Sequence, residues 1–340
     1  MKIIYKNICS VSTMYSLLLY LLHSDKEDIE KTFFFFHHTI PEDISKCFEG
    51  QYFRLPSPGS KGWVKSVKMR LLFWYKYIKW FKLPSFRHKK LFIQDHLEHS
   101  AIMIGHKYYT LLEDAPGAFN FYDNGFFGKN DREFIERPAY KFKRIWCGPV
   151  IYKSFGHNLQ CTDVILSAHY DLDYLKHKTL HYVNIKQKWS EASEAKRQLI
   201  CKLLSIDSGV CREYQKRSIV LFTQPLYKDG VSMSIHEEIY KKLIAKYPQD
   251  QLLLKIHPRD DQFPYESLFP NVAVIRNPLP SQLLELIGIK FDKAVTLFST
   301  AVFDLGYHLP IDWYGTECHP AVLNKSGHVN PPASATICDL

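Results

Sequence analysis

Residues 217–258 read RSIVLFTQPLYKDGVSMSIHEEIYKKLIAKYPQDQLLLKIHP, a strand-length apolar run, a helix-favouring stretch and a second apolar run. The two runs, at 217–225 and 251–258, predict buried strands, and the segment between them predicts a helix over 234–247. A strand, a helix and a strand in this order form the repeating unit of a parallel α/β sheet. The pattern continues with predicted strands at 272–275 and 293–300 and predicted helices at 280–288 and from Ala301. The sequence therefore predicts a doubly wound α/β domain in this part of the chain.

The first half of the chain shows a similar but less regular alternation. Strand-length apolar runs occur at KTFFFFHH (31–38), KLFIQD (90–95) and KYYTLLED (107–114). MKIIYKN at the start predicts another buried strand, followed by the loop NICSVST and an apolar helix within residues 9–22. A polar stretch at 187–205 favours a long helix ahead of the second series. We therefore expect two Rossmann-like domains that face a central cleft, residues 1–205 and 206–340.

The composition fits a folded chain rather than a disordered or fibrous one. The chain has 340 residues, of which 46% are hydrophobic, and carries a formal net charge of +9 at pH 7. A basic surface attracts phosphates, nucleic acid or acidic lipid, and the excess is concentrated at 61–90, where no Asp or Glu occurs. The eight cysteines include no CxxC pair. Their spacing argues against a zinc module or a disulfide framework and favours a cytoplasmic protein.

The apolar segment CSVSTMYSLLLYLL (9–22) follows two lysines, as a signal peptide would. It is too short to span a bilayer, and HSDKEDIEK follows it in place of a small-residue cleavage site. We therefore expect a buried first helix.

Three predicted strands of the second domain end in polar residues. These are Thr223, Gln224 and Asp229 after the first strand, His257, Arg259 and Asp260 after the second, and Ser299 and Thr300 after the fourth. The carboxyl ends of parallel strands share one edge, where open α/β sheets bind ligands. A histidine can donate to a phosphate, an aspartate can deprotonate a hydroxyl, and a helix start can bind an anion. Singly, each residue also fits a turn or an N-cap, and we expect Asp260 and Asp261 to be solvated turn residues.

The segments TQPLYKDG, KIHPRDD and TLFSTA, in this order, resemble glycosyltransferase family 52, the bacterial lipooligosaccharide sialyltransferases. The resemblance is strongest over residues 217–310 and looser over the first domain. It implies a GT-B fold, CMP-sialic acid as the donor, and a galactose-terminated lipooligosaccharide or capsule glycan as the acceptor. It also implies an inverting α-2,3 transfer without metal or cofactor, in an enzyme that forms a homodimer.

The resemblance also assigns roles to the residues at the strand ends. Asp229 matches the base that takes the proton from the acceptor hydroxyl. His257 matches the general acid, or a charge-stabilising partner of the departing CMP phosphate, and Pro258 shapes the turn beside the nucleotide. The other donor-binding residues that it implies are Thr223, Gln224, Arg259, Ser299 and Thr300. The second domain would thus bind the CMP-sugar, and the first would face the acceptor.

The first domain departs from the pattern at its acidic pair. Glu113 and Asp114 stand where related sialyltransferases carry two acidic residues and a glycine, but Ala115 follows here. We therefore expect one of two roles for this pair. Either Glu113 and Asp114 position the reacting groups, or Asp114 is the base in place of Asp229. Candidate acceptor-binding residues in FIQDHLEHS are His96, Glu98 and His99.

Other interpretations stay open at this point. HYDLDY (169–174) has the Asp-x-Asp spacing with which metal-dependent transferases hold a divalent ion, although a solvated turn also fits it. The spacing of lysines in the basic aromatic segment 61–90 predicts an amphipathic helix. It fits an anionic membrane surface and, equally, an ordinary helix of the fold whose aromatic residues pack on the sheet, and no nucleic-acid module accompanies it. The alternatives are a related transferase that uses another CMP-keto-sugar or a nucleotide-hexose, and a non-catalytic membrane- or nucleic-acid-binding protein.

Overall fold

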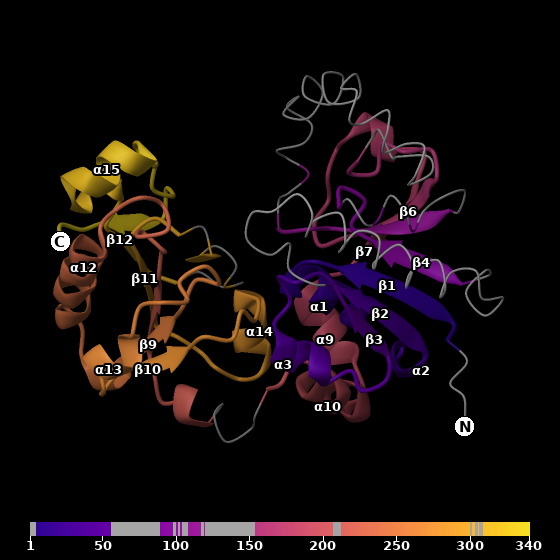
Figure 1. The fold of residues 1–340 in the computed structure, drawn as a ribbon, viewed down its shortest axis with the longest axis horizontal. Helices are drawn as coiled ribbons and strands as arrows, with labels where there is room; N and C mark the ends of the chain where they lie inside the picture. The colour runs from indigo at the N-terminus through magenta and orange to yellow at the C-terminus, as the bar shows by residue number, and fades with distance from the viewer. Residues whose placement is uncertain are drawn as a thin grey trace, which may run out of the picture. The chain divides into compact units, whose positions relative to one another are not determined.

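The computed structural model describes residues 5–55, 89–97, 100, 103, 108–116, 119, 154–206, 212–299, 301, 302, 305 and 309–340. The chain divides into two compact units, Met1–Ser205 and Ile206–Leu340. Each unit contains one sheet (Figure 1), and the strand pairings in both sheets are all parallel.

The first unit contains a seven-stranded sheet in the order β3-β2-β1-β4-β5-β6-β7. Its strands are β1 (Asn7–Val11), β2 (Thr32–Phe36), β3 (Tyr52–Arg54), β4 (Lys90–Ile93), β5 (Tyr109–Leu112), β6 (Cys161–Leu166) and β7 (Thr179–Tyr182). Its helices are α1 (Met14–His23), α2 (Lys26–Glu30), α3 (Glu42–Lys46), the 3-10 turn η2 (Asp173–Leu175), α9 (Ile185–Glu191) and α10 (Glu194–Leu203). Every residue of the neighbouring strands β1 and β2 is buried, as expected for parallel strands covered on both faces.

The start of the chain corrects the sequence analysis. The first described strand is β1, NICSV, whereas the sequence predicts a loop there, after a strand at MKIIYKN. β1 pairs with β2 on one side and β4 on the other, so tertiary pairing decides its position. The helix begins only at Met14, because the Thr13 side chain caps it by accepting from the Ser16 N–H at 3.2 Å. α1 is buried from Met14 to Leu22, which confirms the buried first helix.

The second unit contains a six-stranded sheet in the order β10-β9-β8-β11-β12-β13. Its strands are β8 (Ile219–Phe222), β9 (Leu252–Lys255), β10 (Ala273–Ile275), β11 (Lys293–Thr296), β12 (Ile311–Trp313) and β13 (Ala335–Ile337). Its helices are α12 (Met233–Ala245), α13 (Tyr265–Leu268), α14 (Ser281–Leu286) and α15 (Pro320–Ser326), with 3-10 turns η3 (Gln249–Gln251) and η5 (Thr316–Cys318). The strand–helix–strand unit predicted over 217–258 is confirmed as β8, α12 and β9.

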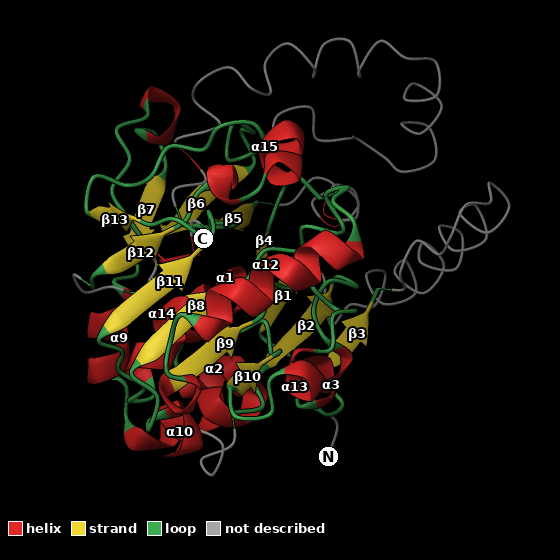
Figure 2. Cartoon of the chain, turned by 90° about the vertical axis from the view of Figure 1, so that its left-hand side faces the viewer, coloured by secondary structure: helices red, strands yellow, loops and turns green. Residues whose placement is uncertain are grey.

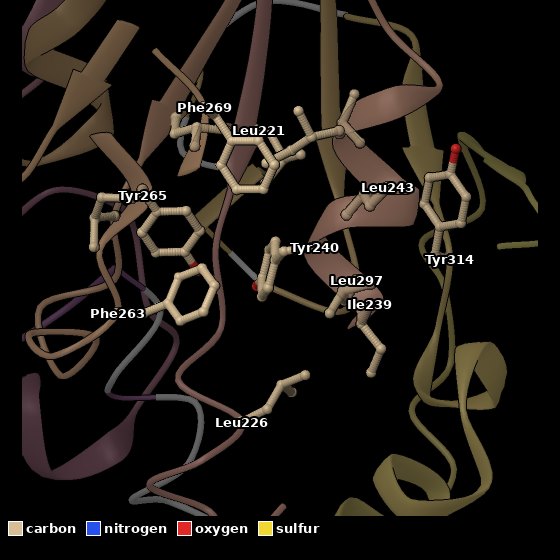
Figure 3. Packing of buried hydrophobic residues seen from close by; sticks show 14 of the residues in the cluster. Leu221, Leu226, Ile239, Tyr240, Leu243, Phe263, Tyr265, Phe269, Leu297 and Tyr314 are labelled. Atoms are coloured by element: carbon tan, nitrogen blue, oxygen red, sulfur yellow. The ribbon is translucent and has the colours of Figure 1, made fainter. Parts of the chain in front are cut away.

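Two apolar layers cover the faces of the second sheet. Leu221 packs in one layer with Tyr240 of α12 (Figure 3). Leu254 belongs to the same layer. Leu253 belongs to the opposite layer, with Leu284 of α14. Because side chains alternate between the faces of a strand, both faces of β9 are buried. Its sequence is accordingly a continuous apolar run that ends at Lys255.

Several boundaries differ from the sequence prediction. The helix expected over 187–205 is two helices, because Ser193 caps α10 by accepting from the Lys196 N–H at 3.2 Å. The final helix expected from Ala301 falls largely on residues outside the described set. The sequence analysis did not predict β3, β6, β7, β12 and β13. Four of these five are only three or four residues long, too short for a periodic signal.

The strand order identifies where each sheet can bind a ligand. In both sheets the chain starts near the middle, moves to one edge, and then returns to build the other half. The reversals lie between β1 and β4 and between β8 and β11, which pair directly (Figure 2). Ligands of open parallel sheets bind outside the carboxyl ends of the strands at such a reversal.

A buried carboxylate fixes the loop structure at the carboxyl edge of the first sheet. Asp95, which follows β4, is only 3% exposed. Its oxygens accept from the N–H of Phe155 at 2.7 Å, the N–H of Gly156 at 2.9 Å and the Tyr109 hydroxyl at 2.8 Å. Phe155 and Gly156 have φ values of 55° and 82°. Three hydrogen bonds to one carboxylate hold this left-handed turn against the sheet.

We predict that Asp95→Ala lowers the free energy of unfolding by roughly 3 kcal/mol or more, because three buried donors each lose their acceptor at about 1–3 kcal/mol. Tyr109→Phe removes one donor and should cost about 1 kcal/mol. Calorimetric unfolding of both variants checks this. Equal losses would contradict the central role of the carboxylate.

Candidate functional site

The carboxyl edge of the second sheet brings together the ends of β8, β9 and β11. β8 pairs with β9 on one side and with β11 on the other. Thr223, His257 and Ser299 follow these three strands. The sequence analysis predicted this shared edge, and the strand pairing confirms it.

Buried hydrogen bonds join the ends of β8 and β9. The Thr223 hydroxyl accepts from the His257 backbone N–H at 2.9 Å and donates to Asp260 Oδ2 at 3.0 Å. The Tyr265 hydroxyl donates to the same carboxylate oxygen at 2.8 Å. Asp260 therefore holds the segment that carries His257.

Asp260 corrects the sequence analysis, which made it a solvated turn residue. It is 1% exposed, and burial raises the pKa of its carboxyl group. Asp261 is exposed, as expected, and forms an ion pair with Lys228 at 2.9 Å. Two adjacent aspartates look alike in sequence, so the sequence does not show which of them is buried. The turn after His257, in which the Asp260 N–H donates to the His257 carbonyl at 2.8 Å, buries Asp260 and leaves Asp261 exposed.

The His257 imidazole is held as a neutral hydrogen-bond donor. The backbone N–H of Arg259 donates to His257 Nδ1 at 3.1 Å. Burial, aided by the charge of Arg259, lowers the pKa of His257 to about 4. At neutral pH the ring therefore carries its single proton on Nε2.

Asp229 forms a two-point ion pair with Arg259. Arg259 Nη1 donates to Oδ1 at 2.9 Å, and Nη2 donates to Oδ2 at 3.4 Å. The negative charge of Asp229 is felt at His257, where it opposes the lowering of the imidazole pKa. The predicted residues Asp229, His257 and Arg259 thus gather beside Pro258 in one part of the edge.

The other predicted residues of this edge are held mostly through backbone and hydroxyl contacts. The Gln224 N–H donates to the buried Tyr240 hydroxyl at 2.6 Å. Ser299 is 6% exposed, its N–H donates to Thr296 Oγ1 at 2.9 Å, and its hydroxyl accepts from the Ala301 N–H at 3.4 Å. Thr300 lies outside the described residues.

Lys255, the last residue of β9, is a charged residue of this edge that the sequence analysis missed. It is 6% exposed, and Nζ donates to the Asn277 carbonyl at 2.8 Å. Burial lowers the pKa of the ammonium group to about 8. The available signal was a lysine two residues before His257 inside an otherwise apolar run.

At the carboxyl edge of the first sheet, the acidic pair after β5 divides into two environments. Glu113 is fully buried, and its carboxylate accepts from the Tyr170 hydroxyl and from the Ser167 N–H at 2.6 Å. Asp114 is partly exposed and accepts from the Gln94 side chain. Burial raises the pKa of both carboxyl groups. Glu113 is thus committed to internal hydrogen bonds, whereas Asp114 reaches the edge.

His96 lies near Asp114, whose pKa it lowers against the effect of burial. The His96 ring stacks on Phe155 with a centroid distance of 4.9 Å and an interplanar angle of 11°. The other two candidate acceptor residues, Glu98 and His99, lie outside the described residues.

The Asp-x-Asp pair in HYDLDY lies on the surface. Asp171 and Asp173 side chains are 96% and 94% exposed, and both approach Lys176. His169 packs its ring against Tyr182 instead. Within the described ranges, no group of three or more His, Cys, Asp or Glu residues is placed to hold a metal ion.

The basic segment 61–90, with the amphipathic helix expected there, lies outside the described residues except for Lys89 and Lys90. In the parts of the chain that the structure does describe, no helix is long and apolar enough to cross a membrane.

Solved structures of bacterial sialyltransferases share this fold. A sialyltransferase from Photobacterium damsela matches with a TM-score of 0.52 and 12% identity, over 98% of this chain and 81% of that chain. A structure of the GT-B domain of a Photobacterium damselae sialyltransferase matches with a TM-score of 0.53 and 11% identity, over 94% and 96%. An α/β-galactoside α-2,3-sialyltransferase from Photobacterium phosphoreum matches with a TM-score of 0.51 and 12% identity, over 97% and 98%. The chain therefore has a GT-B-like fold, as the sequence resemblance predicted.

Sequence comparison gives the family. A curated Haemophilus influenzae protein described as "Uncharacterized protein" is 28% identical over 332 residues, which cover 95% of this chain and 99% of that protein. The model of glycosyltransferase family 52 matches residues 64–321, more than half of the chain and all three strand ends described above. The chain therefore belongs to glycosyltransferase family 52.

Proposed function

We propose that this glycosyltransferase moves sialic acid from CMP-sialic acid to a terminal galactose-type sugar of a bacterial lipooligosaccharide or capsule glycan. The observation that carries the proposal is the edge formed by β8, β9 and β11, where His257 is held as a neutral donor beside Asp229. The second unit binds the CMP-sugar in this proposal, and the first unit faces the acceptor. The likeness of the fold to bacterial sialyltransferases supports the choice of donor.

In the proposed reaction, the acceptor hydroxyl oxygen bonds to the anomeric carbon of sialic acid. The bond from that carbon to the phosphate oxygen breaks, and its electron pair leaves with CMP. Direct displacement inverts the anomeric carbon, and we propose an α-2,3 linkage as the outcome. The hydroxyl proton passes to Asp229, whose ionised carboxylate lies at the same edge as His257.

His257 serves the departing phosphate as a hydrogen-bond donor rather than as a cationic acid. A phosphate monoester has its second pKa near about 6, so the leaving CMP needs little protonation at neutral pH. It needs its negative charge stabilised by donors that are already in place. The Nε2–H of neutral His257 and the hydroxyl proton of Ser299 are donors suited to this task without a metal ion.

The cell setting follows from the proposed acceptor. We propose a cytoplasmic enzyme, able to form a homodimer, that reaches a lipid-anchored glycan at the inner membrane. Residues 61–90, which apart from Lys89 and Lys90 lie outside the described residues, are the proposed membrane-facing segment, since their sequence is basic and aromatic.

A donor screen tests the proposed function directly. The purified chain is incubated with CMP-sialic acid, another CMP-keto-sugar or a nucleotide-hexose and a galactose-terminated acceptor, and products are detected by mass spectrometry. We expect transfer from CMP-sialic acid, unchanged by EDTA. Transfer from a nucleotide-hexose without transfer from CMP-sialic acid would overturn the donor assignment, and loss of activity with EDTA would overturn the metal-free step.

The base is tested by a matched pair of variants. Asp229→Asn should lower kcat about 100-fold or more, because proton transfer in the transition state contributes roughly 10²–10⁴-fold. Asp114→Asn should leave kcat within a few-fold of the parent. Asp261→Asn is the control, since Asp261 is an exposed, ion-paired aspartate near the same turn. The reverse result for Asp114 and Asp229 assigns the base to the first unit.

The role of His257 is tested by two amide substitutions. His257→Gln can place a donor near the position of Nε2, whereas His257→Asn cannot reach that far. We expect kcat to fall about 10²–10³-fold for Asn, as for loss of one oxyanion donor, and less for Gln. Because the free-enzyme pKa of His257 is about 4, kcat/KM should not decline with rising pH between about 5 and 7.5. A decline in that range that His257→Gln removes would identify a cationic acid instead.

A further inference from the structure

The cations at the carboxyl edge of the second sheet differ in how their charge is compensated. Three of those that follow β8, β9 and β10 form ion pairs. These are Lys228 with Asp261 at 2.9 Å, Arg259 with Asp229 at 2.9 Å, and Arg276 with Glu266 at 2.6 Å. Each pair is at least partly exposed to solvent, so these cations are compensated before any ligand binds.

Lys255 lies among them without a counterion. Within the described residues, no carboxylate oxygen lies within 4.0 Å of its Nζ, and its one hydrogen bond goes to the Asn277 carbonyl. It is nevertheless 94% buried, being 6% exposed. Burying a charge without an opposite charge is costly, so such groups usually serve a function or are neutralised.

The position of Lys255 is fixed by the sheet. It is the last residue of β9, in register with Phe222 of β8 and Ile275 of β10. The alternation of side chains places it on the face of Leu253, which α14 covers. Its charge is felt at His257, two residues further along. The Lys255 ammonium group, which donates to the Asn277 carbonyl beyond β10, thus lies at the same edge as the neutral His257 imidazole.

A leaving nucleotide phosphate needs compensation for the charge that it gains. His257 can donate a hydrogen bond but carries no charge at neutral pH, and Arg259 is already paired with Asp229. An ammonium group with donors to spare is a strong partner for a phosphate oxygen. We propose that Lys255 is the cation that binds the phosphate of the nucleotide donor and stabilises the leaving nucleotide. This inference rests on the proposed function and adds the residue that supplies positive charge to the leaving phosphate.

Protonation of Lys255 itself sets the sign of the pH dependence, and burial is what lowers its pKa. The other charged groups of this edge are the ion-paired cations Arg259 and Arg276 and the acidic residues Asp229 and Asp260, while His257 is neutral. Lys255 has a pKa of about 8 in the free protein. It is charged below that pH and loses its proton above it. Phosphate affinity should therefore be present at pH 7 and be lost as the pH rises through about 8.

Calorimetric titration of the full chain with CMP and with cytidine tests the proposal. The variants are Lys255→Met, Lys255→Arg and, as control, Lys325→Met, an exposed lysine that approaches Gly230 of the same edge. Lys255→Met should bind CMP about 10- to 100-fold more weakly at pH 7, the range of a lost charge-assisted hydrogen bond. Its affinity for cytidine should be unchanged, because cytidine lacks the phosphate. The control should bind both ligands as the parent does.

Titrations at several pH values show whether CMP affinity depends on the charge of residue 255 or on the shape of its side chain. Between pH 7 and 9.5, the parent should lose CMP affinity, whereas Lys255→Arg should keep whatever affinity it has, since guanidinium stays charged. Thermal unfolding provides the check on folding. Lys255→Met should be at least as stable as the parent, because it replaces a buried charge without a counterion by an apolar side chain.

Three results would overturn the proposal: unchanged CMP affinity in Lys255→Met, an equal loss for CMP and cytidine, or a large drop in stability. If the parent binds neither ligand, the proposed donor is wrong. The nucleotide found in the donor screen and its nucleoside then replace CMP and cytidine. In that titration the phosphate-specific loss in Lys255→Met again decides the role of Lys255.

Discussion

The arrangement of the candidate site depends on one buried carboxylate, that of Asp260. It accepts from Thr223 after β8 and from Tyr265 in α13, and Thr223 in turn accepts from the backbone N–H of His257. A buried carboxylate is tolerated only where donors surround it, so Asp260 requires the hydroxyl groups of Thr223 and Tyr265, and all three are held together. The consequence is that hydrogen bonds join two strand ends and the start of α13, and they fix the position of the backbone at His257. Preorganised donors of this kind are what transfer to or from a phosphate requires.

The electrostatics of this edge follow from ion pairing and burial. Most of its cations are matched by nearby carboxylates, and the imidazole is kept neutral by burial and by the charge of Arg259. Lys255 differs because the sheet, rather than a counterion, determines where its ammonium group lies. Among the residues that the structure describes, Lys255 is thus a buried cation without a counterion at this edge, which favours an anionic ligand. At the edge of the first sheet, Asp114 is partly exposed, while Glu113 and Asp95 are committed to internal hydrogen bonds.

The sequence by itself determined the elements with strong local signals. The apolar runs that became β2, β4, β5, β8, β9, β10 and β11 were readable because buried parallel strands are apolar on both faces. The polar residues after β8, β9 and β11 could be placed at one edge because all parallel strands of a sheet end there. The motifs in those segments were also specific enough to indicate the family, which the match over residues 64–321 bears out.

Only the tertiary structure decided the position of β1 and the burial of Asp260 and Lys255, because these depend on contacts between residues that are distant along the chain. The strand NICSV became β1 because β2 and β4 pair with it, and its own residues are equally suited to a loop. Asp260 and Asp261 are the same residue type in adjacent positions, yet one is buried among hydroxyl donors and the other faces solvent beside Lys228. In the sequence, Lys255 only marks the end of an apolar run. In the structure, its pairing with β8 and β10 leaves it buried. Local sequence sets the pattern of strands and helices, whereas burial and charge compensation depend on residues that are distant along the chain.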